Sequence, residues 1–472
     1  MFPIYRIAEI ELLETPVVLR MPFRFGIVTL RKCFQAFVRV RIEKPDGKSS
    51  WGATAEMIAP KWFDKNPNLT DDENFEQERA VLRIAREAYL SDISPDTAFG
   101  HFIRHHDAHL KACESEGYNP LLASYGNALI DKAVLDALCR DHGMSFYQVM
   151  QSNVVGMQDR HAQFNGIDFS VFLNQLKPAT HIHARHTVGM VDAITADDIT
   201  EPVNDGLPET LVQVVAHYGH RYYKLKVCGQ LDKDITRLTA IASVLDQIQD
   251  PYFVSLDGNE QYKNAEEVVE LLSTMRATPN LQRMVKSILF VEQPISRAQA
   301  LETDLSNLDL GLPVIMDESD GTLDAFVLAK SKGYSGISSK TCKGIYKSFL
   351  NAARCLQWNA AKSGQHFFMS GEDLTVQAGL SLQQDLALVN LLGITHVERN
   401  GHHYVNGLAS CSQQEQVDFL QSHGDLYENS FGATRVKISE GRLHIASLAC
   451  PGFASAAMPN FSKMQPIRLS DA

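Results

Sequence analysis

The sequence predicts an α/β protein built around a TIM-type barrel, with an α+β unit formed by the first and last parts of the chain. Three observations support this fold class. The 472 residues are enough for two or three domains, or for one large barrel with a second domain. Beyond residue 180, short apolar runs alternate with helical stretches at roughly the spacing of βα units. Before residue 150, the pattern indicates a small sheet followed by helices.

The first unit begins with a strand pattern. Residues 36–43 alternate apolar and charged side chains and then meet Pro45-Asp46-Gly47, which predicts a strand entering a hairpin turn. From about residue 73 the apolar spacing becomes helical, and Gly143 is the expected stop of the last helix. Residues 1–150 are therefore expected to form the α+β unit.

Eight barrel strands are expected after this unit, each a short apolar run typical of buried parallel sheets. They fall at 186–191, 221–227, 252–257, 288–292, 313–317, 335–340, 366–370 and 393–397. A late hairpin, 436–438 with 443–445, is expected to add strands back to the first unit. The predicted segments are thus 1–150 for the α+β unit, 180–425 for the barrel and 426–472 for the returning tail, with the stretch near 150–180 unassigned.

The composition favours a small-molecule enzyme over other classes. Hydrophobic residues make up 44% and charged residues 21%, which is ordinary for a globular protein. A net charge of −12 argues against nucleic acid as a partner, because binding phosphates needs clustered Lys and Arg. The eight cysteines form no CxxC pair, as expected of reduced cytoplasmic thiols. No signal peptide or membrane span is visible, so we expect a cytoplasmic protein without a membrane partner.

Polar residues close five of the expected barrel strands. The strand ends read Lys224-Leu-Lys226, Asp257-Gly-Asn259, Glu292-Gln-Pro294, Asp317-Glu318 and Lys340. Each gap between successive ends is about one βα unit long, and the active site of a TIM barrel lies at the carboxyl ends of its strands. All five ends are therefore expected to point into one pocket.

Three of these ends carry carboxylates on adjacent strands. Asp257, Glu292 and Asp317 would form an all-oxygen cage with open positions, which suits Mg²⁺ and not Zn²⁺, whose sites use His or Cys. A substrate carboxylate can fill the open positions. A single acidic residue after a strand is often only a helix cap, but three in this register favour a metal site.

Lys224 and Lys226 are expected on one face of their strand, since side chains alternate with period two. Neighbouring like charges disfavour protonation, so one of the two could have a lowered pKa and act as a base. Lys340 would approach from the other side of the barrel mouth, because the sixth strand lies roughly opposite the second. Without the carboxylates, a Lys-X-Lys pair would more often be a solvated strand edge.

Together these motifs resemble the muconate-lactonizing-enzyme subgroup of the enolase superfamily, within the mandelate racemase/muconate lactonizing enzyme family. Residues 22–26 and 51–56 are similar to the two loops of its capping domain. Residues 128–143 are similar to the helix before its barrel, and Pro451-Gly452 to its closing turn. The resemblance implies a modified TIM (β/α)7β barrel with an α+β capping domain formed by the N-terminal region and the C-terminal tail.

The resemblance also implies roles for the strand-end residues. Asp257, Glu292 and Asp317 match the Mg²⁺ ligands, with Asn259 and Glu318 supporting them from behind. The lysines match the acid/base groups: Lys226 the base, Lys224 its neighbour that tunes it, and Lys340 the partner on the opposite face. Possible substrate contacts are Phe25 and Trp51 on the two similar loops. Outside the family's motifs, Glu372, Asp373, His402 and His403 are either further substrate contacts or polar loop residues without a site role.

The implied reaction is Mg²⁺-dependent abstraction of a proton alpha to a substrate carboxylate, giving a metal-stabilised enolate. Racemisation or epimerisation, dehydration and cycloisomerisation all begin from this enolate, so the sequence leaves all three open. A small carboxylate substrate and a homo-oligomer are expected. The segments 370–373 and 396–403, taken to follow the seventh and eighth strands, do not match the family's substrate-binding motifs.

Two other functions compete with this one. His181-Ile-His183 resembles the HxH pair of metal-dependent amidohydrolases. That chemistry also needs histidines at the ends of the fifth and sixth strands, where this chain has Asp317 and Lys340, so His181 and His183 are interpreted as loop residues. A non-catalytic barrel scaffold is the second alternative. Its mark would be the loss of a ligand or a lysine, and none is missing.

Overall fold

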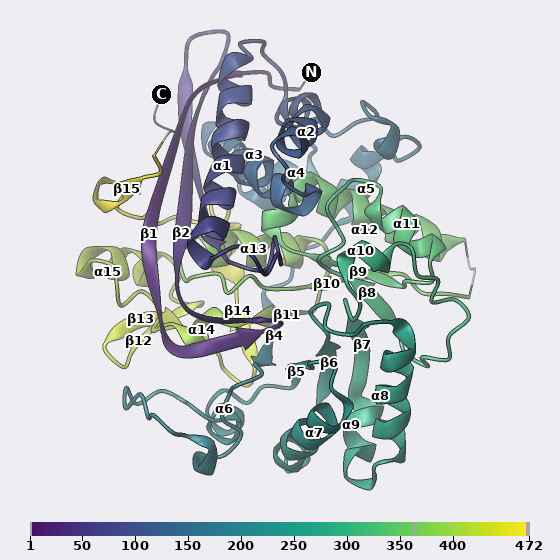
Figure 1. Cartoon of the computed structure of the whole chain (residues 1–472). Helices are drawn as coiled ribbons and strands as arrows, with labels where there is room; N and C mark the ends of the chain where they lie inside the picture. The colour runs from purple at the N-terminus through teal and green to yellow at the C-terminus, as the bar shows by residue number, and fades with distance from the viewer. Residues whose placement is uncertain (1, 362–363, 469–472) are drawn as a thin grey trace.

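A closed barrel of eight parallel strands forms the centre of the computed structural model, which describes residues 2–361 and 364–468 (Figure 1). The strands are β4 (His181–Val188), β5 (Tyr222–Lys226), β6 (Phe253–Asp257), β7 (Ile288–Glu292), β8 (Val314–Met316), β9 (Gly336–Ser339), β10 (Phe368–Gly371) and β11 (His396–Arg399). Each strand pairs in parallel with the next, and β11 pairs with β4 to close the ring. The predicted TIM-type barrel is confirmed.

Helices connect successive strands and cover the outside of the barrel. They are α6 (Leu211–Tyr218), α7 (Leu231–Leu245), α8 (Ala265–Ala277), α9 (Gln282–Ser287), α10 (Arg297–Ala300), α11 (Ala325–Ser331), α12 (Ile345–Ala360) and α13 (Leu380–Leu391). After β11 the chain forms only the single-turn α14 (Gly401–Tyr404) before α15 (Gln413–Ser422). The arrangement agrees with the (β/α)7β pattern that the resemblance implies.

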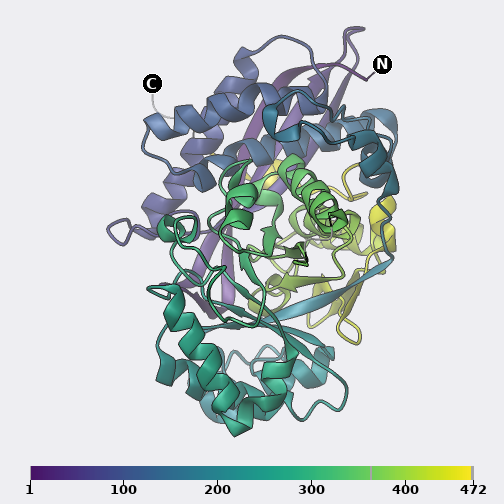
Figure 2. The same cartoon turned by 90° about the vertical axis from the view of Figure 1, so that its right-hand side faces the viewer.

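A four-stranded antiparallel sheet, in the order β15-β1-β2-β3, lies beside the barrel. Its strands are β1 (Arg6–Phe25), β2 (Val28–Glu43), β3 (Ser49–Ile58) and β15 (Gln465–Pro466). Figures 1 and 2 show the purple strands of this sheet alongside the helices α1 (Asp71–Ser91), α2 (Ala98–Ser115) and α3 (Pro120–His142). As predicted, α3 ends at Gly143, whose left-handed backbone (φ 61°) suits glycine.

The stretch near 150–180, which the sequence leaves unassigned, contains α4 (Phe146–Gln151) and α5 (Phe169–Gln175) on the way into the barrel. Along the part of the chain that the structure describes, no helix is long and apolar enough to cross a membrane.

Two barrel strands lie elsewhere than predicted. The first spans 181–188 and not 186–191, so His181 and His183 are strand residues and not loop residues. Its polar side chains hid the strand pattern: Arg185 is fully buried inside the barrel. The eighth strand spans 396–399 and not 393–397, because Gly393 (φ 78°) still belongs to the turn that ends α13.

The late hairpin was also placed wrongly. β14 (Arg442–His444) pairs antiparallel with β4 of the barrel. β13 (Ala433–Val436) pairs with β12 (Tyr427–Ser430), and only β15 among the described strands of the tail joins the first sheet. The division into 1–150, 180–425 and 426–472 stays a prediction.

One buried carboxyl in α3 makes stability depend on pH. Asp131 is 3% exposed, and the Tyr89 hydroxyl donates a hydrogen bond to it (2.8 Å). Burial raises the pKa of Asp131 to about 8. The folded protein therefore holds this proton more tightly than the unfolded chain does. The resulting stabilisation is complete below about pH 4 and is lost as the pH rises towards 8.

The variant Asp131→Asn is expected to be more stable than the wild type at pH 8, on the order of 3 kcal/mol, because an amide carries no charge to bury. The gain should vanish near pH 4. Urea unfolding at pH 4.5, 6 and 8 measures this difference. Glu87→Gln, an exposed change on α1, is the control and should leave the pH profile unchanged. A wild-type profile in Asp131→Asn would contradict the raised pKa.

Candidate active site

The carboxyl ends of adjacent strands bring the predicted residues together. Lys226 and Asp257 are register partners across β5 and β6, and Asp257 and Glu292 are partners across β6 and β7. Asp317 directly follows β8, and Lys340 directly follows β9. All five side chains are buried. Parallel strands of a barrel end at the same mouth, which explains this convergence.

A cavity of about 20 Å³ lies at this mouth, roughly the room for one water molecule. Its lining from the barrel side is Lys224, Lys226, Asp257, Asn259, Asp317, Lys340, Asp373, Leu374, Thr375, Glu398 and Asn400. Its lining from the side of the first sheet is Phe23, Phe25, Leu30, Ala59 and Trp62. The turn between β1 and β2 and the segment after β3 therefore cover the barrel mouth.

Lys224 lies at the centre of a cluster of carboxylates. Its Nζ is 2.9 Å from Asp257, 2.8 Å from Glu292, 2.7 Å from Glu372 and 2.9 Å from Glu398. Burial alone would lower the pKa of Lys224, but these carboxylates outweigh it and hold the pKa well above its ordinary value. The sequence predicted that the neighbouring lysine lowers the pKa of one lysine of this pair. For Lys224 this prediction is wrong, because the carboxylates raise its pKa.

Lys226 and Lys340 occupy matching positions in the cavity wall. Lys226 Nζ lies 2.5 Å from Asp257 Oδ2 and 5.9 Å from the centre of the Phe25 ring. Lys340 Nζ lies 2.6 Å from Asp317 Oδ2 and 4.1 Å from the Trp62 ring. Burial alone would lower the pKa of Lys340, but Asp317 outweighs it and raises the pKa. Two lysine side chains from opposite strands thus face one cavity, an arrangement suited to proton transfer.

Two of the three predicted metal ligands are held as anions. Burial alone would raise the pKa of Asp257 and of Asp317. Lys224 and Lys226 outweigh it at Asp257, and Lys340 with Lys343 outweighs it at Asp317, so both values are lowered. The backbone N–H of Asp317 is fixed by the Gln293 side chain (2.9 Å).

Glu292 differs from these two aspartates. Burial and the nearby Asp257 raise its pKa well above the ordinary value. Its Oε1 accepts a hydrogen bond from Lys224 (2.8 Å). Its Oε2 also lies 2.8 Å from Lys224 Nζ but has no hydrogen-bond partner among the described residues. A buried carboxylate oxygen without a donor, beside two more carboxylates, fits a hard cation such as Mg²⁺. The donor set contains oxygen atoms only.

Asn259 and Glu318 lie behind the carboxylates. The backbone N–H of Asn259 donates to Asp257 Oδ1 (2.9 Å), and its amide donates to Glu318 Oε1 (3.2 Å). Lys65, from the segment after β3, contacts both the Asn259 carbonyl (2.8 Å) and Glu318 (3.0 Å). Sequence reasoning missed Lys65, which ties the covering segment to the barrel.

The last two strands add residues that sequence reasoning placed imprecisely. Glu398 lies within β11 and lines the cavity, but the predicted eighth strand stopped one residue before it. Glu372 lies beneath the cavity, where it contacts Lys224 and Arg185. Asp373 lines the cavity, and burial, partly opposed by Arg399, raises its pKa to about 7.

Solved structures match this chain over nearly its whole length, although the sequence matches no protein-family model and no curated protein. A mandelate racemase/muconate lactonizing protein from Herpetosiphon aurantiacus is 16% identical with a TM-score of 0.60, covering 96% of this chain and 99% of that one. A muconate lactonizing enzyme from Pseudomonas fluorescens, complexed with muconolactone, is 17% identical with a TM-score of 0.58, covering 97% and 98%. The chain has the fold of the enolase superfamily.

Other structures with the enolase-superfamily fold are described with magnesium. A dipeptide epimerase from Enterococcus faecalis, complexed with Mg and the dipeptide L-Leu-L-Tyr, is 14% identical with a TM-score of 0.56, covering 93% of this chain and all of that one. The structural neighbours thus include proteins described as a mandelate racemase/muconate lactonizing protein, a muconate lactonizing enzyme and a dipeptide epimerase.

Four predicted contacts are absent from the cavity lining: Glu372, which lies next to Lys224 and Arg185, and Trp51, His402 and His403. Trp51 is part of β3, with the Arg39 guanidinium over its ring (4.6 Å), and Trp62 is the tryptophan that lines the cavity. His402 and His403 are buried in α14 and are absent from the lining. Trp51 lies in a sheet strand and the two histidines pack outside the barrel, so the structure does not place these three residues at the predicted substrate site.

The HxH pair also lies away from this site. His181 and His183 are at the beginning of β4, where they pair with β14, whereas the cavity is at the opposite, carboxyl ends of the strands. The structure gives no support to an amidohydrolase centre at these two residues.

Proposed function

We propose that this chain is a Mg²⁺-dependent enzyme of the enolase superfamily that removes a proton from the carbon next to a substrate carboxylate. The observation that supports this most is the placement of Lys226 and Lys340, which come from β5 and β9 and line one cavity, each beside a carboxylate. The racemases, epimerases and lactonizing enzymes with the same fold support the same class of reaction.

Asp257, Glu292 and Asp317 would hold the Mg²⁺ ion. When bound, the ion supplies positive charge that holds a substrate carboxylate and favours loss of the neighbouring proton. The Lys224 ammonium contacts two of these ligands in the present arrangement. It would retain Glu372 and Glu398 as partners after giving up those contacts.

The two lysines would divide the proton transfer. Lys226 Nζ in its unprotonated form accepts the α-proton, and Lys340 Nζ, kept protonated by Asp317, donates a proton or balances charge on the other face. Phe25 and Trp62 cover these nitrogens and exclude water. Two lysines on opposite faces permit racemisation or epimerisation, while dehydration and cycloisomerisation begin with the same abstraction.

The substrate is a small carboxylic acid in this proposal. The cavity holds about 20 Å³, less than such a substrate needs, so the residues that cover the mouth would have to move apart for it to bind. We also propose a cytoplasmic homo-oligomer, as the composition and the family resemblance lead us to expect.

A screen for α-proton exchange tests this function. Dipeptides, N-acylated amino acids, sugar acids and lactone-forming diacids are incubated with the protein in D₂O with Mg²⁺, and NMR follows loss of the α-proton signal. Exchange of at least one class is expected, and EDTA should stop it. A protein whose Tm does not respond to Mg²⁺ and that exchanges no member of the panel would be the non-catalytic scaffold instead.

Trp62→Ala is expected to lower the exchange rate roughly 2- to 30-fold, because it removes the aromatic face over Lys340 and admits water. Trp51→Ala is the matched control, since Trp51 lies in β3 and away from the cavity. Its exchange rate should stay within about twofold of the wild type. Equal losses in the two variants would contradict the assignment of Trp62 to the cavity wall.

A further inference from the structure

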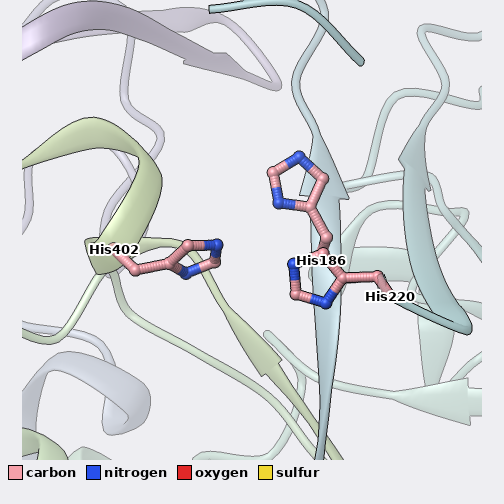
Figure 3. Close-up of side chains that lie close together, drawn as sticks. All are labelled: His186, His220 and His402. Atoms are coloured by element: carbon pink, nitrogen blue, oxygen red, sulfur yellow. The ribbon is translucent and has the colours of Figure 1, made fainter. Parts of the chain in front are cut away.

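A group of histidines lies on the outer face of the barrel, separated from the cavity by strand β4. Thr187 of this strand points inward, where it donates to Glu398 (2.6 Å), and Arg185 points inward to Glu372. His186 between them points outward, because side chains alternate along a strand. There it meets His220 from the turn before β5 and His402 from α14 (Figure 3).

The three imidazole rings are buried and converge. Their exposed fractions are 2% for His186, 1% for His220 and 6% for His402. One ring nitrogen of each lies within 4.8 Å of those of the other two. Figure 3 shows the His402 ring reaching from its own element towards the other two rings. Modest side-chain rotations would bring three such nitrogens to the separation that one metal ion requires.

The hydrogen bonds leave the converging nitrogens without partners. His220 Nδ1 lies 3.0 Å from the Ala184 carbonyl, which can only accept, so this nitrogen carries the hydrogen and Nε2 carries a lone pair. His220 Nε2, His186 Nδ1 and both nitrogens of His402 have no hydrogen-bond partner among the described residues. Buried polar atoms without partners are costly unless something binds them. A backbone carbonyl that orients one nitrogen while the other faces the cluster is the usual setting of a metal-binding histidine.

We propose that His186, His220 and His402 form a second metal site, specific for a transition-metal ion such as Zn²⁺. Three neutral imidazoles suit Zn²⁺ or Co²⁺, whereas Mg²⁺ selects oxygen ligands and stays with the carboxylates. The Arg435 guanidinium donates to the His402 carbonyl (3.3 Å), so positive charge lies nearby. An anionic fourth ligand such as hydroxide is therefore favoured.

A second group of possible ligands, Asp92, His101 and His105, carries no such proposal. Asp92 is already paired with Arg104, whose Nη1 lies 2.6 Å from the carboxylate. The carboxylate of this group therefore already has a positively charged partner, whereas the outer cluster of three histidines contains no carboxylate.

The location gives the outer site a structural consequence. His186 belongs to β4 and His402 follows β11, and these two strands pair to close the barrel. A metal ion would therefore link the first and last strands across the closing seam. It would also fix the segment that follows Glu398 and Asn400, two residues of the cavity lining.

Cobalt binding tests the proposal directly. The full-length protein is stripped with a chelator, dialysed, supplied with saturating Mg²⁺ to occupy the carboxylate site, and titrated with Co²⁺. One equivalent of Co²⁺ with the visible spectrum of a four-coordinate ion is expected, with three nitrogen ligands and one oxygen ligand, and Zn²⁺ should displace it. The Tm should rise on binding. A wild-type protein that binds no Co²⁺ in the presence of Mg²⁺, or shows only the weak octahedral spectrum, would overturn the proposal.

Variants locate the bound ion. His402→Gln and, independently, His186→Asn should lose the tetrahedral spectrum. His217→Gln, a change at an exposed histidine of α6, should retain it. Glu292→Gln, at the carboxylate site, should also retain it, which separates failure here from failure of the proposed reaction. An unchanged cobalt spectrum in folded His402→Gln or His186→Asn would show that these histidines do not bind the ion. If both variants misfold, the wild-type titration with Co²⁺ still tests whether the site exists.

Discussion

Lys226→Met is expected to lower α-proton exchange about 10²- to 10⁴-fold, the usual contribution of a general base, while Mg²⁺ binding stays intact. Lys226 lines the cavity, and among the described residues its Nζ pairs with Asp257 alone, which keeps Lys224 as a second partner. The methionine side chain fills much the same space without the amine. NMR exchange in D₂O gives the rate, and the Mg²⁺-induced shift in Tm reports metal binding.

Lys233→Met, on the exposed face of α7, is the matched control and should exchange at the wild-type rate. The corresponding change at Lys340 distinguishes the reaction types. In a racemase or epimerase, each lysine variant should lose exchange from one stereoisomer and keep it from the other. In a dehydratase or cycloisomerase, one lysine should dominate. Normal exchange of both isomers in Lys226→Met would remove this lysine from the role of base.

Glu292→Gln is expected to abolish the response to Mg²⁺ and to lower metal-dependent activity at least about 10³-fold, because the ion contributes several kcal/mol to the reaction. Glu292 is the cleanest position for this test. Lys224 keeps Asp257, Glu372 and Glu398 after the change, so no ammonium group is left unpaired. The pKa of Glu292 is already raised, so an uncharged amide should leave the metal-free protein as stable as the wild type.

Glu372→Gln provides the matched control for this experiment. Glu372 is an equally buried carboxylate that also contacts Lys224, but it is not among the proposed ligands. Differential scanning fluorimetry with and without Mg²⁺ should show a wild-type shift for this variant and none for Glu292→Gln. A full Mg²⁺ shift in Glu292→Gln would show that the cage has been assigned wrongly.

The fold was predicted from strong local patterns in the sequence, chiefly runs of apolar residues. Buried parallel strands such as 253–257 and 288–292 appear as mostly apolar runs that end in a carboxylate, and their spacing indicated the barrel that the structure confirms. Strands with polar inward side chains were harder, as with β4, where Arg185 and Thr187 interrupt the pattern. Their partners are Glu372, which directly follows β10, and Glu398 of β11, both far along the chain, so no local signal indicates these contacts.

The sequence by itself determined which residues close the barrel strands, because a strand end is a local feature and the barrel sends all such ends to one mouth. It therefore predicted the set Lys224, Lys226, Asp257, Glu292, Asp317 and Lys340 before any distance was known. Tertiary structure alone decided the charge around Lys224, the choice of Trp62 over Trp51 in the cavity wall, and the meeting of His186 with His402. Each of these depends on contacts between residues distant in the chain. Sheet register and barrel closure create those contacts, and a one-residue shift in a strand would turn its side chains to the opposite face.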